Sequence, residues 1–114
     1  MKLVTAVFKP SRLDAVIDAL KEAGATGLTV SEVRGYGRQQ GKTEVYRGAE
    51  YEVRLLPKVQ VEIACTSESV DAVCDAIITA ANTGTIGDGK IFVRPLDTVI
   101  RIRTGERDGQ AVSG

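Results

Sequence analysis

The chain has 114 residues, enough for one domain with a single hydrophobic core. Fifteen basic residues balance fifteen acidic ones and histidine is absent, so the formal net charge is zero. This balance argues against a protein that binds nucleic acid through bulk positive charge, and without histidine a serine–histidine or cysteine–histidine nucleophile is excluded. Two cysteines are too few for a disulfide-rich secreted scaffold, and no apolar run is long enough to cross a bilayer. We therefore expect a soluble cytoplasmic protein.

The first half of the chain has the pattern of strand, helix and strand. Residues 2–9 form a short apolar run of the length of a buried strand, and Pro10 ends it. Ser11 is a candidate N-cap for a helix in which apolar residues recur at helical spacing until Gly24. Residues 28–34 alternate and are rich in β-branched side chains, which predicts a second strand.

The second half repeats this plan. Residues 59–64 alternate as a strand with one covered face should, and Ser67 or Ser69 can cap a helix that Gly84 stops. Residues 90–94 and 98–103 predict two further short strands. Two such units in one small domain predict an α+β fold of the ferredoxin-like kind, in which a four-stranded antiparallel sheet carries both helices on one face.

A long connection from Gly35 to Pro57 joins the halves and is several times longer than is typical of compact domains. Residues 34–58 hold six positive and three negative charges, and residues 86–103 hold four and two, so the rest of the chain is net negative. The connection carries almost no aliphatic side chains before Leu55. It is either a partner-docking finger, with Tyr46 or Tyr51 as sites of modification, or a plain β-hairpin extension with solvated charges.

A glycine-rich segment, residues 84–90, has the Gly-x4-Gly-Lys spacing of a phosphate-binding loop. Ile91 stands where such loops need serine or threonine, and the segment leads from a helix into a strand rather than the reverse, so a P-loop nucleotide hydrolase is excluded. The glycines would still let backbone N–H groups approach an anion beside Lys90. The alternative is a turn that needs only the positive φ that glycine allows.

Two further pairs of residues bear on the chemistry. Arg101 and Arg103 are two positions apart on a predicted strand, so both guanidinium groups would lie on one face and could bind one polyphosphate. The alternative is an edge strand protected by its charge. Cys65 and Cys74 are predicted to pack in the core, because free cysteine behaves as a small apolar residue.

Over nearly the whole chain, these segments resemble the PII family of nitrogen-regulatory signal-transduction proteins. The stretches that carry the resemblance are 35–39, 43–51, 56–59, 83–84, 86–93 and 99–106. The resemblance implies one ferredoxin-like signalling domain, residues 1–114 with a long loop at about 37–55, assembled as a homotrimer. A sheet with helices on one face leaves the other face uncovered, so trimerisation would bury it. The implied ligands are ATP or ADP in clefts between subunits, and 2-oxoglutarate together with Mg-ATP.

The resemblance also implies a role for individual residues. The adenine end is expected at Thr29 and Ala64. The expected contacts of the phosphates and of the loop base are Gly37, Arg38, Gln39, Gly87, Asp88, Gly89 and Lys90, with Arg101 and Arg103 reaching over from a neighbouring subunit. Gln39 would join the Mg²⁺ shell that 2-oxoglutarate completes, and Lys58 would pair with the far carboxylate of that ligand. Tyr51 is the expected site of uridylylation or adenylylation.

The implied partners are an ammonium transporter, enzymes or regulators of nitrogen assimilation and a nucleotidylyltransferase. The protein would act as a regulator, bind no nucleic acid, and reach the membrane only through the transporter, without inserting. Three positions, Gln40, Arg54 and Thr85, depart from the charges common in the family. Thr85 removes a positive charge beside the phosphates, which predicts a lower nucleotide affinity, and the other two change the charge of the finger.

Three other classes remain open on the residues alone. An enzyme of the acylphosphatase type shares the small ferredoxin-like plan and a phosphate-gripping loop, although no residues are arranged to activate a water molecule. A metal-binding module would need a cysteine or histidine cluster near the first loop, and there is none. An RNA-binding domain of this fold would need stacking aromatics on its central strands, and the chain has only two phenylalanines and three tyrosines.

Overall fold

The computed structural model describes residues 1–37, 42–46, 49–53 and 55–113. Along the chain they form β1 (Lys2–Phe8), α1 (Leu13–Glu22), β2 (Thr29–Gly35), β3 (Lys42–Tyr46), β4 (Ala49–Val53), β5 (Leu56–Cys65), α2 (Val70–Ala81), β6 (Lys90–Pro95) and α3 (Gly109–Ser113). Short 3-10 turns at Pro10–Arg12 and Ser67–Ser69 precede α1 and α2.

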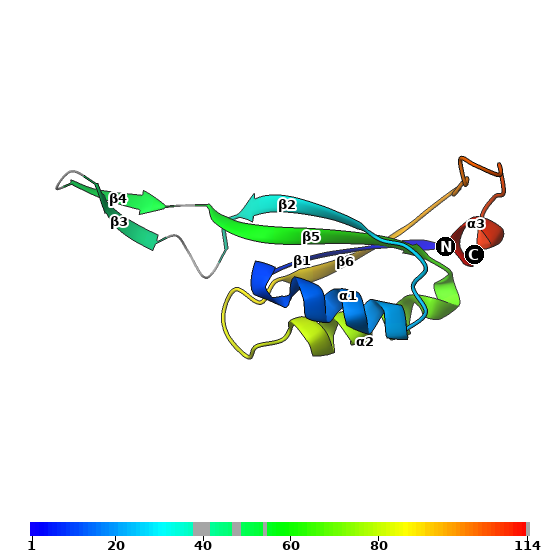
Figure 1. The fold of residues 1–114 in the computed structure, drawn as a ribbon, viewed down its shortest axis with the longest axis horizontal. Helices are drawn as coiled ribbons and strands as arrows, with labels where there is room; N and C mark the ends of the chain where they lie inside the picture. The colour runs from blue at the N-terminus through cyan, green and yellow to red at the C-terminus, as the bar shows by residue number, and fades with distance from the viewer. Residues whose placement is uncertain (38–41, 47–48, 54, 114) are drawn as a thin grey trace.

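Four strands form one antiparallel sheet in the order β2-β5-β1-β6. Both α1 and α2 lie against the same face of this sheet, as Figure 1 shows. The predicted α+β, ferredoxin-like arrangement is therefore confirmed. The strands β3 and β4 pair with each other in a separate two-stranded sheet, which lies beyond one end of the main sheet (Figure 1).

The hydrophobic core lies between the sheet and the two helices. Because successive residues of a strand point to opposite faces, every second residue of β1 and β5 enters this core. The buried members from the sheet are Val4, Ala6, Phe8, Val59, Val61, Ile63 and Cys65, and those from the helices are Val16, Leu20, Val73, Ile77, Ala80 and Ala81. Cys74 packs against this cluster, so the prediction that both cysteines are core residues is confirmed. Burial raises the pKa of both thiols, which disfavours the reactive thiolate.

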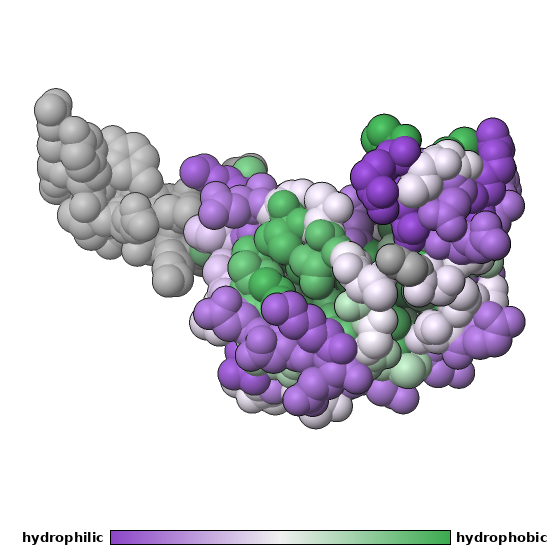
Figure 2. Space-filling view, turned by 45° about the vertical axis from the view of Figure 1, so that its right-hand side comes forward, coloured by the Kyte–Doolittle hydropathy of each residue, from purple (hydrophilic) through white to green (hydrophobic). Residues whose placement is uncertain are grey.

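Neither α1 nor α2 covers the other face of the sheet. We call it the open face, and it carries the residues that alternate with the core residues, such as Leu3, Thr5, Glu62 and Phe92. Thr5 donates a hydrogen bond to Glu62 across the open face, with an oxygen–oxygen distance of 3.1 Å. Phe92 is 52% exposed. Figure 2 shows apolar surface in the middle of the body, bordered by hydrophilic side chains.

The predicted N-caps of the helices were less accurate than the predicted end of α1. Ser11 is not an N-cap, because it lies inside the 3-10 turn and Arg12 occupies the N-cap of α1. Ser69 is at the N-cap of α2 but its side chain makes no capping bond; its hydroxyl pairs with that of Thr66 at 2.9 Å. Gly24 ends α1 as predicted, with a φ of 92°. The amides of Gly24 and Ala25 then bond back to the carbonyls of Lys21 and Leu20, which satisfies the last turn.

The predicted strand over 98–103 was wrong. The chain makes only an isolated bridge between Ile100 and Arg107, and it turns back between these two residues. Gly105 has a φ of 72°, and its amide donates to the carbonyl of Arg101 at 2.8 Å. The alternation of apolar and basic residues fits an extended strand, but the glycine allows a tight turn that the alternation does not reveal.

None of the helices in the described residues has the length and apolar character that a membrane span requires.

Candidate anion-binding cleft

A cleft of about 630 Å³ opens at the end of the sheet nearest β3 and β4. Its walls come from three stretches that are far apart in the sequence: the end of β1, the residues on either side of the long loop, and the segment from residue 85 into β6. Of the residues assigned by resemblance, the cleft brings together Gly37, Lys58, Gly87, Asp88, Gly89 and Lys90. These six residues, which span more than fifty positions of the chain, therefore line one cleft.

Glycine is required in this loop for two different reasons. Gly87 and Gly89 both have positive φ, at 97° and 104°. Gly89 is also pressed against the backbone of β1, where a Cβ atom would lie 1.8 Å from the carbonyl oxygen of Val7. Gly84 has a φ of 75°, but a Cβ there would meet nothing within 4 Å. The loop is thus packed onto the strand at Gly89 and open to solvent at Gly84.

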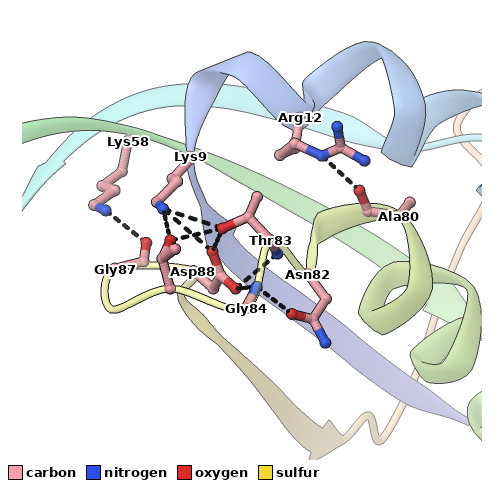
Figure 3. Close-up of polar contacts among 10 residues, drawn as sticks. Lys9, Arg12, Lys58, Ala80, Asn82, Thr83, Gly84, Gly87 and Asp88 are labelled. Carbon is pink, nitrogen blue, oxygen red and sulfur yellow. Dashed lines mark hydrogen bonds and ion pairs between the residues drawn. The ribbon is translucent and has the colours of Figure 1, made fainter.

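The Asp88 carboxylate turns inward and folds the loop. It accepts hydrogen bonds from the backbone amides of Thr83 and Gly84, at 2.8 and 3.0 Å, and a short one from the Thr83 hydroxyl. Lys9 forms an ion pair with it at 3.3 Å (Figure 3). These partners, the Thr83 hydroxyl first, hold the pKa of Asp88 well below its usual range. The side chain of this predicted phosphate contact is therefore engaged within the loop.

Lys9 was missed by sequence reasoning. Its ammonium group lies 2.5 Å from the Thr85 hydroxyl and 3.3 Å from the Thr83 hydroxyl, in addition to its ion pair with Asp88. It follows β1 directly, so the pairing of β1 with β6 places it beside the loop. Only that strand pairing could have indicated its position, because no spacing along the chain relates residue 9 to residues 83–88.

Lys58 bonds to the loop from the side of β5. Its ammonium group donates to the carbonyl of Gly87 at 2.8 Å (Figure 3). Burial lowers the pKa of Lys58, the charge of Lys9 lowers it further, and Asp88 acts in the opposite direction. Lys9, directly after β1, and Lys58, on β5, thus both approach the loop that leads to Lys90.

The remaining assigned residues lie elsewhere in the chain. Thr29 and Ala64 are near the other end of the sheet, since Ala64 is six residues beyond Lys58 on β5, or about 20 Å. Arg101 and Arg103 belong to the C-terminal turn at that same far end, opposite the loop between α2 and β6 (Figure 1). They do not share one extended face as predicted, because the chain turns between them and Gly105.

Arg101 contributes to its own turn. Its guanidinium group forms an ion pair with Glu106 at 3.0 Å and donates to the carbonyls of Gln110 and Ala111, each at 3.2 Å. Between the two arginines, Ile102 is 99% exposed.

Four sequence-based expectations lie outside the described residues: those for Arg38, Gln39, Gln40 and Arg54. Tyr51 lies in β4, opposite Glu44 on β3, and its side chain is outside the description.

Two observations bear on the alternative classes. Among the described residues, no group of three or more His, Cys, Asp or Glu side chains could hold a metal ion. The central strands β1 and β5 contain one aromatic residue, Phe8, and it is buried in the core rather than available to stack on a base.

The fold and the cleft define a small ferredoxin-like domain with a glycine-rich, lysine-bearing pocket suited to anions. The family model described as "Nitrogen regulatory protein P-II" matches residues 1–106. Proteins named nitrogen regulatory protein P-II from Klebsiella oxytoca and Rhizobium etli are 58% and 57% identical over 112 residues, and nitrogen regulatory protein P-II 1 of Escherichia coli K12 is 57% identical. Each alignment covers 98% of this chain and all of the relative. The chain belongs to the P-II family of nitrogen regulatory proteins.

Proposed function

We propose that this P-II protein reports nitrogen, carbon and energy supply by binding ATP or ADP, and 2-oxoglutarate together with Mg-ATP, in the cleft. The observation that carries the proposal is that Lys58, from β5, lines the same cleft as Gly87, Gly89 and Lys90 of the glycine-rich segment. Glycine lets backbone N–H groups approach phosphate oxygens, and two ammonium groups can offset part of the triphosphate charge. The residue roles are those that the resemblance implies, with Gln39 in the Mg²⁺ shell and Lys58 on 2-oxoglutarate.

The division of the assigned residues between two ends of the molecule supports a site shared by neighbouring chains. The loop that holds Lys90 is at one end, and Thr29, Ala64, Arg101 and Arg103 are at the other (Figure 1). One chain cannot bring these ends together, whereas a head-to-tail contact would, and such contacts close into rings. The homotrimer that the resemblance implies would also cover apolar side chains such as Phe92 on the open face.

The proposed output is the finger, residues about 37–55, which leaves the body directly from the cleft at Gly37 and returns to it before Lys58. Mg-ATP with 2-oxoglutarate would order the base of the finger, whereas ADP would leave it able to dock to a partner, so ligand state would bias partner affinity. The partners are those that the resemblance implies: an ammonium transporter and enzymes or regulators of nitrogen assimilation. The protein would act from the cytoplasm as a single signalling domain.

Calorimetry on the purified protein tests this function. Wild type should bind ATP and ADP in competition, and should bind 2-oxoglutarate only when Mg-ATP is present. Lys58→Ala should reduce 2-oxoglutarate affinity at least about tenfold, because a charge-assisted bond to a carboxylate is lost. Lys21→Ala removes the same charge from an exposed site on α1 and should change nothing. Undiminished 2-oxoglutarate binding by Lys58→Ala would refute that assignment, and a wild type that binds no nucleotide would refute the proposed function.

We also propose Tyr51 as the acceptor of the nucleotidylyl group. Incubation with a nucleotidylyltransferase and labelled UTP or ATP should label wild type and leave Tyr51→Phe unlabelled. Labelling of Tyr51→Phe would instead direct attention to Tyr46.

We propose no catalytic role. Steady phosphate release that is lost in Lys90→Ala would contradict this and favour an acylphosphatase-type enzyme.

A further inference from the structure

The loop between α2 and β6 is fastened to the end of β1 by one side chain. The Lys9 ammonium group contacts the hydroxyls of Thr83 and Thr85 and the carboxylate of Asp88, residues that are at least 74 positions away in the sequence (Figure 3). We call Lys9 and these three partners the clasp. Within the clasp, the Thr83 hydroxyl also pairs with that of Thr85 at 2.7 Å and with Asp88.

We propose that Lys9 is a positioning residue of the anion-binding cleft: through the clasp it fixes the loop so that Gly87, Gly89 and Lys90 stand where phosphates would bind. This inference rests on the proposed function and deepens it, because Lys9 itself would not touch the ligand.

The geometry distinguishes positioning from direct binding. A lysine ammonium group has three protons, and the clasp supplies three acceptors for them. The Lys9 side chain is 22% exposed, and Lys9 is not among the residues that line the cleft. Lys58 and Lys90 do line it. The lysine of the clasp therefore stands behind the loop, and the other two face the space that a ligand would occupy.

The charges in the clasp give a second reason to assign Lys9 a positioning role. Asp88 puts a carboxylate into a loop that is proposed to receive phosphates, which would repel an anionic ligand if it were unpaired. Lys9 offsets that charge at 3.3 Å, on the side of the loop away from the cleft that Lys58 and Lys90 line. Loss of Lys9 would loosen the loop and also leave the Asp88 carboxylate without its counter-ion.

The other end of the loop meets the same strand. Gly89 packs against the carbonyl of Val7, two residues before Lys9. The end of β1 thus contacts the loop twice, through backbone packing at Gly89 and through the clasp at residues 83–88. Movement is restricted at both contacts, so the clasp and Gly89 together fix residues 83–89, which lead directly into Lys90.

The experiment compares four variants with wild type: Lys9→Met, which keeps the length of the side chain; Lys9→Arg, which keeps its charge; Thr85→Val, which removes one acceptor; and Lys21→Met, the matched control on an exposed helix position. Hydrogen exchange of the unliganded protein is followed at the amides of Thr83 and Gly84, which bond to Asp88. Calorimetry measures the affinity for ADP.

Lys9→Met should speed exchange at these two amides about tenfold and weaken ADP binding by a similar factor, as expected for the loss of a charged hydrogen-bonded contact. Thr85→Val should have a smaller effect of the same kind. Lys9→Arg should retain most of the protection from exchange and most of the ADP affinity. Lys21→Met should match wild type in both measurements. Core amides of β1 and β5 should exchange at unchanged rates in all variants, which shows that the fold is intact.

Unchanged exchange at Thr83 and Gly84 in Lys9→Met would overturn the proposal. Weaker ADP binding with unchanged exchange would also overturn it, because Lys9 would then be a direct ligand. If Lys9→Met does not fold, Thr85→Val decides by the same criteria. A wild type that binds no ADP would refute the proposed function, while the exchange rates of the unliganded protein would still decide whether Lys9 holds the loop.

Discussion

The loop between α2 and β6, which leads into Lys90, and the turn after β6, which holds Arg101 and Arg103, both adjoin basic residues assigned to the phosphates, but the surroundings of these residues differ. At the loop, Lys9 and Asp88 form an ion pair behind the glycines, and Lys90 lines the cleft. In the turn, Arg101 is bonded to Glu106 and to two carbonyls of its own segment, which keeps the turn folded. In the proposed site, the loop would thus supply an ordered group of phosphate contacts, whereas the turn leaves Arg103 exposed beside a fully exposed Ile102.

This difference predicts that the loop can keep its structure in a single chain, whereas the turn can contribute to a cleft only when two chains associate. The loop is fixed by contacts within one chain, so its order should survive when chains separate. The turn lies at the opposite end of the body, so it can serve a cleft only in another copy (Figure 1). In the proposed trimer, separation of the subunits should therefore abolish the proposed shared site and leave the loop intact.

The largest effect is expected from Leu3→Asp. Leu3 is on the open face, opposite Ala64 and Arg94, and it alternates with the buried Val4, so a charge there should not enter the core of the single chain. Sedimentation should show monomers in place of the proposed trimers, and the proposed nucleotide affinity should fall at least about a hundredfold, because burial of an unpaired carboxylate opposes association.

A suitable control is Ile78→Asp, which adds the same charge on the helix layer at a position that is 52% exposed. It should leave the assembly unchanged. Trimers of Leu3→Asp that bind nucleotide normally would contradict the shared site.

A smaller effect is expected from Gly89→Ala, which tests the loop alone. The added Cβ would collide with the Val7 carbonyl and would require an alanine at positive φ. We expect a loss of about 2 kcal/mol or more in the free energy of unfolding and a clear loss of nucleotide affinity. Gly84→Ala also places alanine at positive φ but meets no neighbour, so it should cost only about 1 kcal/mol. Equal losses in both variants, measured by denaturant unfolding, would show that packing against β1 is unimportant.

The smallest effect concerns pH. Because the pKa of Asp88 is lowered in the folded protein, its charged form stabilises the loop fully above the ordinary carboxyl range near pH 4. That stabilisation is lost as the pH falls through this range toward the lowered pKa. Carbon-13 NMR titration of the carboxyl group measures this directly. Thr83→Val should raise the pKa of Asp88 more than Lys9→Met does, since the Thr83 hydroxyl is the largest cause of the shift. The reverse order would show that the ion pair dominates.

The sequence was sufficient to predict the body of the fold. Alternation in β5 and the apolar stripe of α2 indicate which residues are buried, and Gly24 ends α1 where expected. The strand predicted over 98–103 failed because a turn at Gly105 depends on long-range contacts such as Arg101 with Ala111, which alternation cannot reveal. Ser11 failed as a cap because Pro10 starts a 3-10 turn before α1.

The candidate site was predictable only where motifs carried it. The glycine-rich segment and Lys58 were named from the sequence, and the structure brings them together. Lys9 could not be named, because its partners are determined by the pairing of β1 with β6. The inward orientation of Asp88 was equally hidden, since an aspartate between two glycines is compatible with an outward or an inward side chain.

The strand order has a consequence for folding during synthesis. β1 and β2 are not neighbours in the sheet; β5 separates them, and β6 pairs only with β1. Before β5 is made, β3 and β4 can pair with each other, but β1 and β2 have no partner strand, so the main sheet begins to form when β5 emerges. The cleft forms later, after the loop before β6 and β6 itself have been synthesised. Pairings between such distant segments form slowly, so the cleft is completed only after β6 has been made.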